Sequence, residues 1–342
     1  MKQIWITKVG GPEVLQPKEA PDPEVKTGEV RIRVKAAGIN FADLLARQGL
    51  YPDAPKLPAV VGYEVAGVVD QVGNGADFKM GDRVGAITRF GGYSDTLSVP
   101  QSFVFPLPSR LSFEEGAAIP VNYLTAWLML VEQGNAKKGD KVLIHAAAGG
   151  VGQAALQICK WRGVEVFGTA SASKHARLKE LGVDHCIDYH RQDFEAEVKR
   201  LTAGVGVTVV LDAVGGESYG KSYNCLAPLG KLMMFGVSSF SPGENRSLFS
   251  VAKGFLRMPS FKPIPLMNQN RGVMGFNLGH LWDRRSLLQQ ALVDILKNIE
   301  AGIFKPLVDR SFPLEKAGEA HAYLHAHKNF GKVVLSVTPE TL

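Results

Sequence analysis

The sequence predicts an α/β protein in which a doubly wound parallel sheet domain follows a β-rich domain. Two observations carry this prediction. Up to about residue 120, short apolar runs alternate with glycine and proline, which is typical of strands joined by tight turns. From Leu124 on, helix-like segments alternate with nearly continuous apolar runs, which indicates parallel strands covered on both faces.

The first part contains short strands, two helices and many turn residues. Pro55, Pro58, Gly73, Gly75 and Gly81 are among the residues that bound the strands. The expected strands include Val30–Ala36, Val65–Val72, Arg83–Ile87 and Tyr93–Val99, and the expected helices lie near Phe41–Arg47 and Phe113–Ile119.

The second part contains six strands of the buried, parallel type, and a helix–helix–strand segment follows it. The segment Ser238–Asn270 is rich in proline, aromatic and basic residues, and we expect it to form a lid or insertion. The expected strands are Val142–Ile144, Val164–Gly168, His185–Asp188, Val207–Asp212, Lys231–Gly236 and Val273–Phe276, followed by helices in Leu287–Ala301 and Pro313–His327 and a strand at Lys332–Val337.

A small-residue turn, His145–Gly152, joins the first of these strands to a helix-like segment, Gln153–Trp161. Its small residues are spaced as Ala147-x-Gly149-x-x-Gly152, close to the G-x-G-x-x-G pattern of dinucleotide-binding turns, with alanine in place of the first glycine. Small residues let backbone N–H groups approach a pyrophosphate, and the helix N-terminus adds partial positive charge. Because a second strand follows at βαβ spacing, we interpret this segment as the start of a Rossmann domain.

The loop after the second strand indicates which nicotinamide dinucleotide is bound. NAD-dependent proteins generally place an acidic residue about 20 residues beyond the glycine turn, where it binds the ribose 2′-hydroxyl. Here the chain runs from Thr169 through Ser171 and Ser173 to Lys174, with no acid. Hydroxyls and a cation suit a 2′-phosphate, so we predict NADP(H). Ser171 or Ser173 can also cap the next helix.

Composition excludes several other classes. No run of 18 apolar residues occurs, and the N-terminus lacks the apolar core of a signal peptide. The three cysteines are scattered, as in a cytoplasmic protein with reduced thiols. The net charge of +6 is spread along the chain without a basic block, so we expect no nucleic-acid partner.

Several motifs together resemble the medium-chain dehydrogenase/reductase superfamily, and within it the zinc-independent quinone oxidoreductases. The motifs are residues 37–43 (AGINFAD), 48–52 (QGLYP), 62–67 (GYEVAG), 81–84 (GDRV) and the AAAGGVG turn. Residues 38–51, 167–175, 187–190 and 275–279 look most like the subgroup of synaptic vesicle membrane proteins. The resemblance implies a GroES-like domain over residues 1–122, completed by 283–342. It also implies a Rossmann domain over 123–282, with the lid-like segment at 238–270.

The resemblance also bears on metal content. Zinc-dependent relatives carry a cysteine in the region of Asn40–Asp43 and a histidine at the place of Tyr63. Here neither residue type is present, and no cysteine precedes Cys159. We therefore expect no metal. His321 and His325 have the spacing of a zinc pair on a helix, but a solvated or packed helix face is the preferred interpretation.

The resemblance implies a set of site residues. Asn40 would orient the nicotinamide or hold the substrate carbonyl. Tyr51 would donate a proton or only pack against the lid, and quinone reduction can take its proton from water. The 2′-phosphate and adenosine end would meet Ser171, Lys174 and Tyr189. The remaining cofactor contacts would be Thr125 at the carboxamide, Gly149, Gly150 and Val151 at the pyrophosphate, Phe235, Gly236 and Val237 after the fifth strand, and Phe276 and Leu278 at the nicotinamide pocket. Related reductases often have a polar residue at the position of Val237.

The implied function is NADPH-dependent transfer of hydride to a quinone or an α,β-unsaturated carbonyl. The alternative is an NADPH-binding, membrane-peripheral adaptor or regulatory protein with little turnover. This alternative rests on the interleaved Phe249, Phe255 and Phe261 with Lys253, Arg257 and Lys262. The strand Val273–Phe276 would leave an unpaired edge on the sheet, and proteins of this group are often dimers through this edge. We therefore predict a homodimer.

Overall fold

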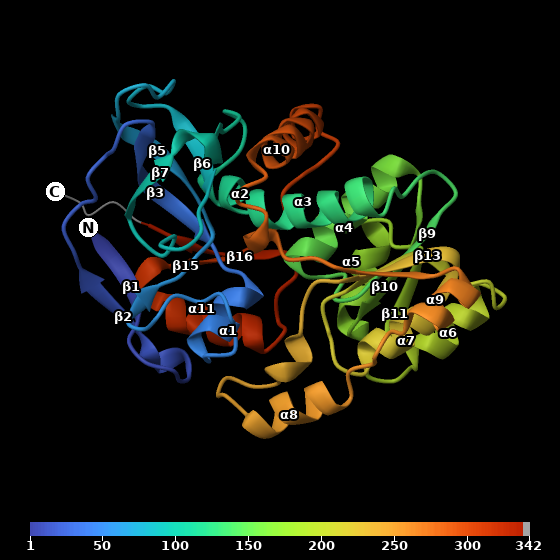
Figure 1. Cartoon of the computed structure of the whole chain (residues 1–342). Helices are drawn as coiled ribbons and strands as arrows, with labels where there is room; N and C mark the ends of the chain where they lie inside the picture. Colours follow the sequence, from blue (N-terminus) through green and yellow to red (C-terminus); the bar gives the residue numbers. More distant parts are fainter. Residues whose placement is uncertain (338–342) are drawn as a thin grey trace. The chain divides into compact units, whose positions relative to one another are not determined.

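A computed structural model describes residues 1–337 of the chain (Figure 1). These residues form two compact units. The first unit contains Met1–Leu124, Gly243–Arg246 and the chain from Gly279 on, and the second contains Thr125–Pro242 and Ser247–Leu278. The short piece Gly243–Arg246 joins the first unit through Gln48, whose Nε2 donates to the carbonyl oxygens of Gly243 (2.7 Å) and Glu244 (3.1 Å).

The first unit is built on two sheets. A seven-stranded sheet has the order β15-β16-β3-β5-β6-β8, with β7 paired to β3, and a small sheet has the order β2-β1-β4. Every pair is antiparallel except β15 with β16. The strands are β1 (Lys2–Ile6), β2 (Leu15–Glu19), β3 (Glu29–Gly38), β4 (Ala59–Val60), β5 (Glu64–Val72), β6 (Arg83–Ile87), β7 (Thr96–Pro100), β8 (Val104–Pro106), β15 (Val308–Pro313) and β16 (Lys332–Ser336).

Alternation along β3 shows why this sheet has one buried face. Its side chains alternate between partly exposed and buried from Glu29 to Ala36, so Val30, Ile32 and Val34 enter the core at 0–1% exposure. The helices of this unit are α1 (Phe41–Arg47), α2 (Phe113–Ala117), α10 (Arg285–Glu300) and α11 (Ala317–His325). β16 pairs with β3 near the middle of the sheet, so the C-terminal part of the chain completes the β-rich unit.

The second unit holds a six-stranded sheet in which every pair is parallel, in the order β11-β10-β9-β12-β13-β14. This order is that of a doubly wound dinucleotide-binding fold, so the predicted fold class is confirmed. The strands are β9 (Lys141–Ile144), β10 (Glu165–Ala170), β11 (His185–Asp188), β12 (Val207–Asp212), β13 (Leu226–Met234) and β14 (Gly272–Gly275).

Helices connect these strands and cover the sheet. Helix α3 (Pro120–Trp127) starts in the first unit, enters the second at Thr125 and continues as a wider helical turn over Leu128–Gln133. The other helices are α4 (Gly150–Arg162), α5 (His175–Glu180), α6 (Phe194–Leu201), α7 (Ser218–Asn224), α8 (Leu248–Leu256) and α9 (Pro263–Gln269).

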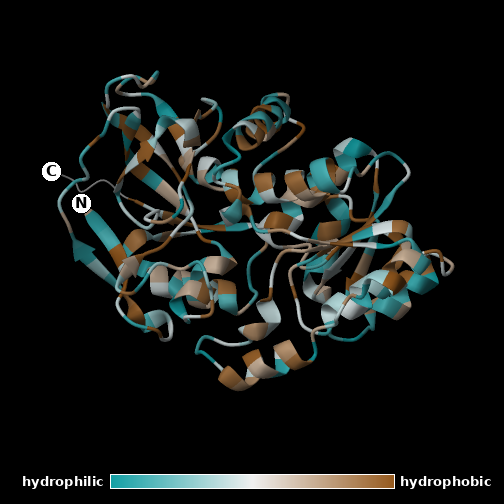
Figure 2. Cartoon of the chain, viewed as in Figure 1, coloured by the Kyte–Doolittle hydropathy of each residue, from teal (hydrophilic) through white to brown (hydrophobic). Residues whose placement is uncertain are grey.

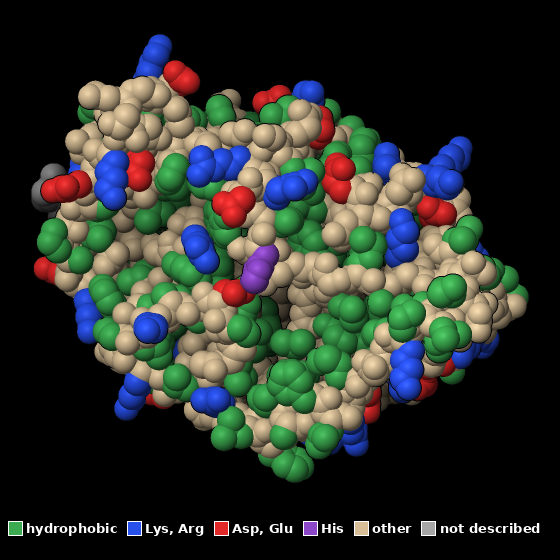
Figure 3. Space-filling view, in the orientation of Figure 1, with side chains coloured by type: hydrophobic (Ala, Val, Ile, Leu, Met, Phe, Trp, Pro, Cys, Tyr) green, Lys and Arg blue, Asp and Glu red, His purple; other side chains and the backbone are tan. Residues whose placement is uncertain are grey.

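The segment expected as a lid forms α8 and α9, and its apolar side chains are exposed. Helix α8 is largely brown at the bottom of Figure 2, and hydrophobic side chains gather at the same place in Figure 3. The exposed fractions reach 78% at Phe249 and 87% at Leu256, and Leu248, Phe255, Ile264 and Met267 are exposed as well. None of the helices described within residues 1–337 has the length and apolar character needed to cross a bilayer.

Candidate functional site

The turn between β9 and α4 exposes backbone N–H groups at the carboxyl end of a central strand. Gly149 is the N-cap of α4, and no acidic residue occurs in the first turn of the helix. Helix geometry leaves the N–H groups of Gly150 and Val151 without partners inside the helix. A Cβ on Gly152 would lie 2.5 Å from the carbonyl oxygen of Ala146, so only glycine lets the helix pack this closely against the turn. This backbone cradle fits a pyrophosphate.

The loop after β10 carries Ser171 and Lys174. Ser171 precedes a single 3-10 turn, Ala172–Lys174, and its side chain makes no capping hydrogen bond. Its Oγ lies 3.3 Å from Oγ of Ser173. Because no carboxylate occurs between Val166 and Arg177, the loop suits a phosphate rather than a ribose hydroxyl. Tyr189, just after the neighbouring strand β11, is 46% exposed.

Further predicted residues follow β13 and β14 at this same edge of the sheet. The N–H of Phe235 donates to Asp212 O on β12, and the N–H of Phe276 donates to Met234 O on β13. A Cβ on Gly236 would lie 2.8 Å from the carbonyl oxygen of Ala213. Parallel strands end together, so these residues, Val237 and Leu278 lie on strand ends or on the loops just beyond them. Thr125 is buried in α3 of the same unit.

A buried polar cluster of Asp212, Ser222 and His145 lies beneath this edge of the sheet. Asp212 Oδ1 accepts the N–H groups of Val214 (2.7 Å) and Gly215 (3.2 Å), and its Oδ2 accepts the Ser222 hydroxyl at 2.6 Å. His145 Nε2 lies 2.9 Å from Oγ of Ser222, and burial lowers the pKa of this histidine. The cluster fixes the turn that follows β12, and it lies too deep to meet a substrate directly.

In the first unit, Asn40 lies at the centre of a charged cluster. Its Nδ2 donates to Glu64 Oε1 at 3.0 Å, and its Oδ1 accepts from Lys332 Nζ at 2.6 Å. Glu64 and Lys332 are 0% and 3% exposed and form an ion pair with each other. The second oxygen of Glu64 accepts the N–H of Val121 at the start of α3, at 2.7 Å.

Strand register explains why these three residues meet. Gly38, at the end of β3, pairs with Val334 of β16, and its neighbour Ala37 pairs with Val65 of β5. Asn40, Glu64 and Lys332 therefore reach the same end of the sheet. A Cβ on Gly38 would lie 2.5 Å from Glu64 Oε1, so this glycine leaves room for the carboxylate. Glu64 and Lys332 are not among the predicted site residues, although each begins an apolar strand with a charge.

Behind Asn40, Asp43 begins a second buried network. Its carboxyl accepts the N–H of Asn40 (2.8 Å), the N–H of Gly62 (3.1 Å) and the hydroxyl of Tyr93 (3.1 Å). Complete burial raises the pKa of Asp43 to about 7, although these hydrogen bonds and the charge of Lys332 oppose the shift.

This second network continues to helix α11. The Tyr93 hydroxyl also lies 2.9 Å from Nε2 of His321. His321 and His325 are buried, at 0% and 4% exposure, and burial lowers the pKa of His321. The two histidines thus belong to a packed helix face.

Tyr51 is half-buried, and its ring meets the ring of Tyr63 edge-on, with centroids 6.4 Å apart. The Phe90 ring also packs against the Tyr63 ring, with centroids 5.4 Å apart. Burial raises the pKa of Tyr63 well above its ordinary value. The Tyr63 hydroxyl is buried.

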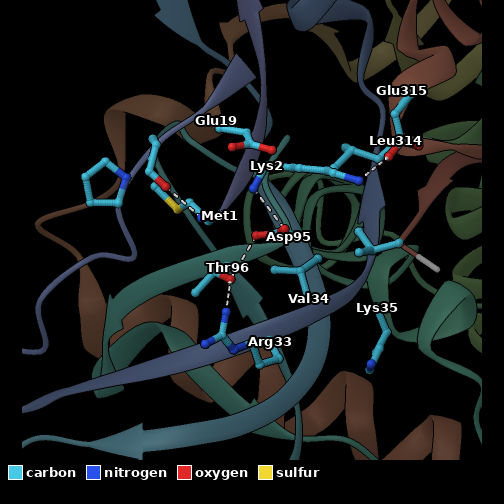
Figure 4. A pocket seen from close by; sticks show the side chains of 13 residues that line it. Met1, Lys2, Glu19, Arg33, Val34, Lys35, Asp95, Thr96, Leu314 and Glu315 are labelled. Carbon is cyan, nitrogen blue, oxygen red and sulfur yellow. Dashed lines mark hydrogen bonds and ion pairs between the residues drawn. The ribbon is translucent and has the colours of Figure 1, made fainter. Parts of the chain in front are cut away.

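A cavity of about 710 Å³ also lies in the first unit, at the N-terminal strand (Figure 4). Lys2, Arg33 and Asp95 line it, and none of the predicted site residues does. Polar groups that line it already bond to one another, since the backbone N–H of Lys2 donates to Asp95 Oδ2 at 2.8 Å and Arg33 Nη1 donates to Thr96 Oγ1 at 2.7 Å. The cavity is therefore separate from the candidate site.

Two family models match the chain. An alcohol dehydrogenase GroES-like domain matches residues 26–109, and a zinc-binding dehydrogenase domain matches residues 181–335. The residues at the expected metal position do not fit zinc, because Asn40 and Tyr63 are poor ligands. Within residues 1–337, no group of three His, Cys, Asp or Glu side chains is arranged to hold a metal ion.

Known proteins are similar over nearly the whole chain. The synaptic vesicle membrane protein VAT-1 homolog of Rattus norvegicus is 43% identical over 344 residues, which cover 99% of this chain and 85% of the relative. A quinone oxidoreductase of Pseudomonas aeruginosa is 36% identical, and the matched region covers 98% of this chain and 99% of the relative.

Solved structures agree with these relatives. The Escherichia coli quinone oxidoreductase complexed with NADPH has a TM-score of 0.87 at 32% identity, covering 98% of this chain and all of that one. The CurK enoyl reductase has a TM-score of 0.86 at 29% identity, covering 98% and 99%. With the parallel sheet, the glycine turn and the GroES-like unit, these similarities show that the chain belongs to the medium-chain dehydrogenase/reductase family, close to the VAT-1 homologues and the quinone oxidoreductases.

Proposed function

We propose that the protein is an NADPH-dependent oxidoreductase that reduces a quinone or an α,β-unsaturated carbonyl without zinc. The observation that carries the proposal is the carboxyl edge of the parallel sheet, where the α4 cradle and the carboxylate-free loop Ser171–Lys174 follow adjacent strands. The NADPH complex of the similar E. coli quinone oxidoreductase supports it.

Each predicted residue has a role in this proposal. The N–H groups of Gly150 and Val151 would bind the pyrophosphate, and Ser171, Lys174 and Tyr189 would bind the 2′-phosphate end. Phe235, Gly236, Val237, Phe276 and Leu278 would line the nicotinamide end, with Thr125 at its carboxamide. When bound there, NADPH supplies hydride, and the chain's own contribution is orientation and exclusion of water.

In the first unit, we propose that Asn40 donates a hydrogen bond to the carbonyl oxygen in the reaction and that Tyr51 donates the proton. Asn40 has an amide hydrogen left over after its bond to Glu64. Tyr51 is half-buried beside another phenol, which suits a proton donor to an enone and is less needed for a quinone.

A turnover screen tests the proposal. NADPH consumption is measured with a panel of quinones and enones, and with NADH in place of NADPH. We expect turnover on at least one carbonyl substrate, with NADPH preferred at least tenfold over NADH. Elemental analysis of the same sample should find less than stoichiometric zinc, and chelators should leave the rate unchanged. No turnover on any member of the panel would contradict the proposal.

One observation favours a second candidate, an adaptor that binds NADPH and docks on a membrane surface. Exposed Phe249, Phe255 and Leu256 share the α8–α9 segment with Lys253 and Lys262, a composition that suits anionic lipid. Co-sedimentation with anionic vesicles, compared with neutral vesicles, tests this function. A protein that turns over NADPH and stays in the supernatant of both would exclude it.

We also propose that the protein is a cytoplasmic homodimer. Its three cysteines, Cys159, Cys186 and Cys225, form no disulfide, as expected for a reducing compartment. Strand β14 ends the sheet order and pairs only with β13 among the described strands, which leaves one side open for a symmetry-related copy. Light scattering at micromolar concentration should give twice the chain mass, and a monomer mass would refute the dimer.

A further inference from the structure

The orientation of the Asn40 side chain follows from its two charged neighbours. An amide has one hydrogen-bond-accepting oxygen and one donating nitrogen, so its hydrogen-bond partners fix which way it faces. Here the oxygen faces the ammonium of Lys332 and the nitrogen faces the carboxylate of Glu64. The opposite orientation would set donor against donor and acceptor against acceptor, so the two charges allow one orientation only.

This arrangement leaves Asn40 as a hydrogen-bond donor. One of its two amide hydrogens is used by Glu64, and the second remains available. The bond from the Lys332 ammonium draws electron density toward Oδ1, which strengthens the remaining N–H as a donor. A donor held in this way matches a carbonyl oxygen, whose negative charge grows during reduction.

Stability alone does not explain the buried ion pair between Glu64 and Lys332. Glu64 and Lys332 are almost fully buried, and a buried ion pair is often no more stabilising than apolar residues of similar volume. The pair comes from strands far apart in the chain, and Asn40 lies 292 residues from Lys332. The backbone N–H of Val121 fills the remaining oxygen of Glu64, so the carboxylate is fixed as well.

We propose that Glu64 and Lys332 are positioning residues that hold Asn40 as a fixed donor toward a carbonyl oxygen. This inference rests on the proposed function. The carbonyl belongs either to the substrate or to the carboxamide of the cofactor, and the experiment distinguishes these two sources.

The central variant is the double replacement E64Q/K332M, which removes both charges together and so leaves no buried charge unpaired. Its control is E195Q/K199M, which removes a partly exposed ion pair on α6 (2.5 Å). Asn40 is observed directly through its side-chain ¹H–¹⁵N signals in protein labelled at asparagine, with N40A identifying them. Thermal unfolding establishes that each variant is folded.

We expect the Asn40 side-chain signals to shift and lose protection from hydrogen exchange in E64Q/K332M and to stay unchanged in the control. We also expect kcat/KM to fall roughly tenfold in the double variant and roughly 100-fold in N40A. If the carbonyl is the substrate's, kcat falls while the Kd of NADPH stays within threefold. If it is the cofactor carboxamide, the Kd of NADPH rises in step.

The results separate this inference from the proposed function. Unchanged Asn40 signals in a folded E64Q/K332M protein overturn the positioning role, whatever the activity. A kcat/KM within twofold of wild type in that variant does so too. If wild-type protein has no turnover but the Asn40 signals respond as expected, the proposed reaction fails and the positioning of Asn40 stands.

Discussion

The two units present functional groups in opposite ways. At the parallel sheet of the second unit, the pyrophosphate part of the candidate site is built from backbone: N–H groups at the start of α4 and glycines that let chain segments approach. In the first unit the candidate site is built from side chains, with Asn40, Glu64 and Lys332 in direct contact. Backbone N–H groups bind the pyrophosphate, which many cofactors share, whereas specific side chains select one class of substrate. Cofactor binding and substrate choice should therefore respond to different mutations.

The largest expected effect tests the side-chain site. Tyr51→Phe should lower turnover of an enone by roughly 10²–10⁴-fold, because a positioned proton donor is lost while the ring remains. Turnover of a quinone should fall less, since water can protonate the reduced oxygen, and the Kd of NADPH should stay near that of wild type. Steady-state rates on one enone and one quinone are the measurement. Equal enone rates for both proteins would assign the proton to water or Asn40.

The next effect tests the 2′-phosphate end of the candidate site in the second unit, where side chains rather than backbone are expected to make the contact. Lys174→Ala should weaken NADPH binding by about 1.5–3 kcal/mol through loss of a charge-assisted contact. NADH binding, measured by the same fluorescence titration, should hardly change. Lys179→Ala is the matched control, because Lys179 is exposed on the following helix. Equal weakening of both cofactors would make Lys174 a structural residue.

A smaller effect tests the packing of the glycine turn. Gly152→Ala should destabilise the protein by about 1–3 kcal/mol, because the new Cβ meets the carbonyl oxygens of Ala146 and Ala147 at 2.5 and 2.7 Å. Gly243→Ala, where a Cβ meets nothing within 4 Å, should be close to neutral. Urea unfolding of both variants provides the comparison. A stable Gly152→Ala protein would show that the turn adapts.

The smallest effect concerns the pH dependence of stability in the first unit. Burial raises the pKa of Asp43 from 3.8 to about 7, so the folded state holds a proton that the unfolded state loses. The contribution of this group is therefore greatest below about pH 4 and declines as pH rises toward 7. We expect Asp43→Asn to flatten this decline by about 1 kcal/mol or more between pH 4.5 and 7. Parallel slopes for the two proteins in urea unfolding would exclude Asp43 as the cause.

The same contrast decides what could be predicted from the sequence. The fold class and the glycine turn depend on local patterns: apolar strands, a helix after each strand, and glycines within eight residues. Strands β1, β2, β4, β8 and β15 are not among the strands named from the sequence. β2 and β15 have one buried residue each, and β4 and β8 have only two and three residues, too few to show a pattern. β1 also falls outside the predicted set, with a buried Ile4 and Ile6 only.

The cluster of Asn40, Glu64 and Lys332 could not be predicted from local sequence patterns, for a different reason. Glu64 and Lys332 each look like an ordinary charge at the start of a strand. Their meeting depends on the pairing of β16 with β3 and of β3 with β5, which no short stretch of sequence encodes. The positions of Tyr51 and Tyr63 side by side likewise follow from the fold of the long loop between α1 and β5.

The late position of β16 has a consequence for the order of folding during synthesis. Strand β3 is made early, but one of its neighbours in the sheet is translated only about 300 residues later, while every strand of the parallel sheet lies between them. Because domains generally fold as they leave the ribosome, the dinucleotide-binding unit can fold while the β-rich unit still waits for its last strand. Until then Ala36–Gly38 of β3 lack their partner strand, although Glu29–Arg33 can already pair with β7, so the end of the sheet beside Asn40 is completed last.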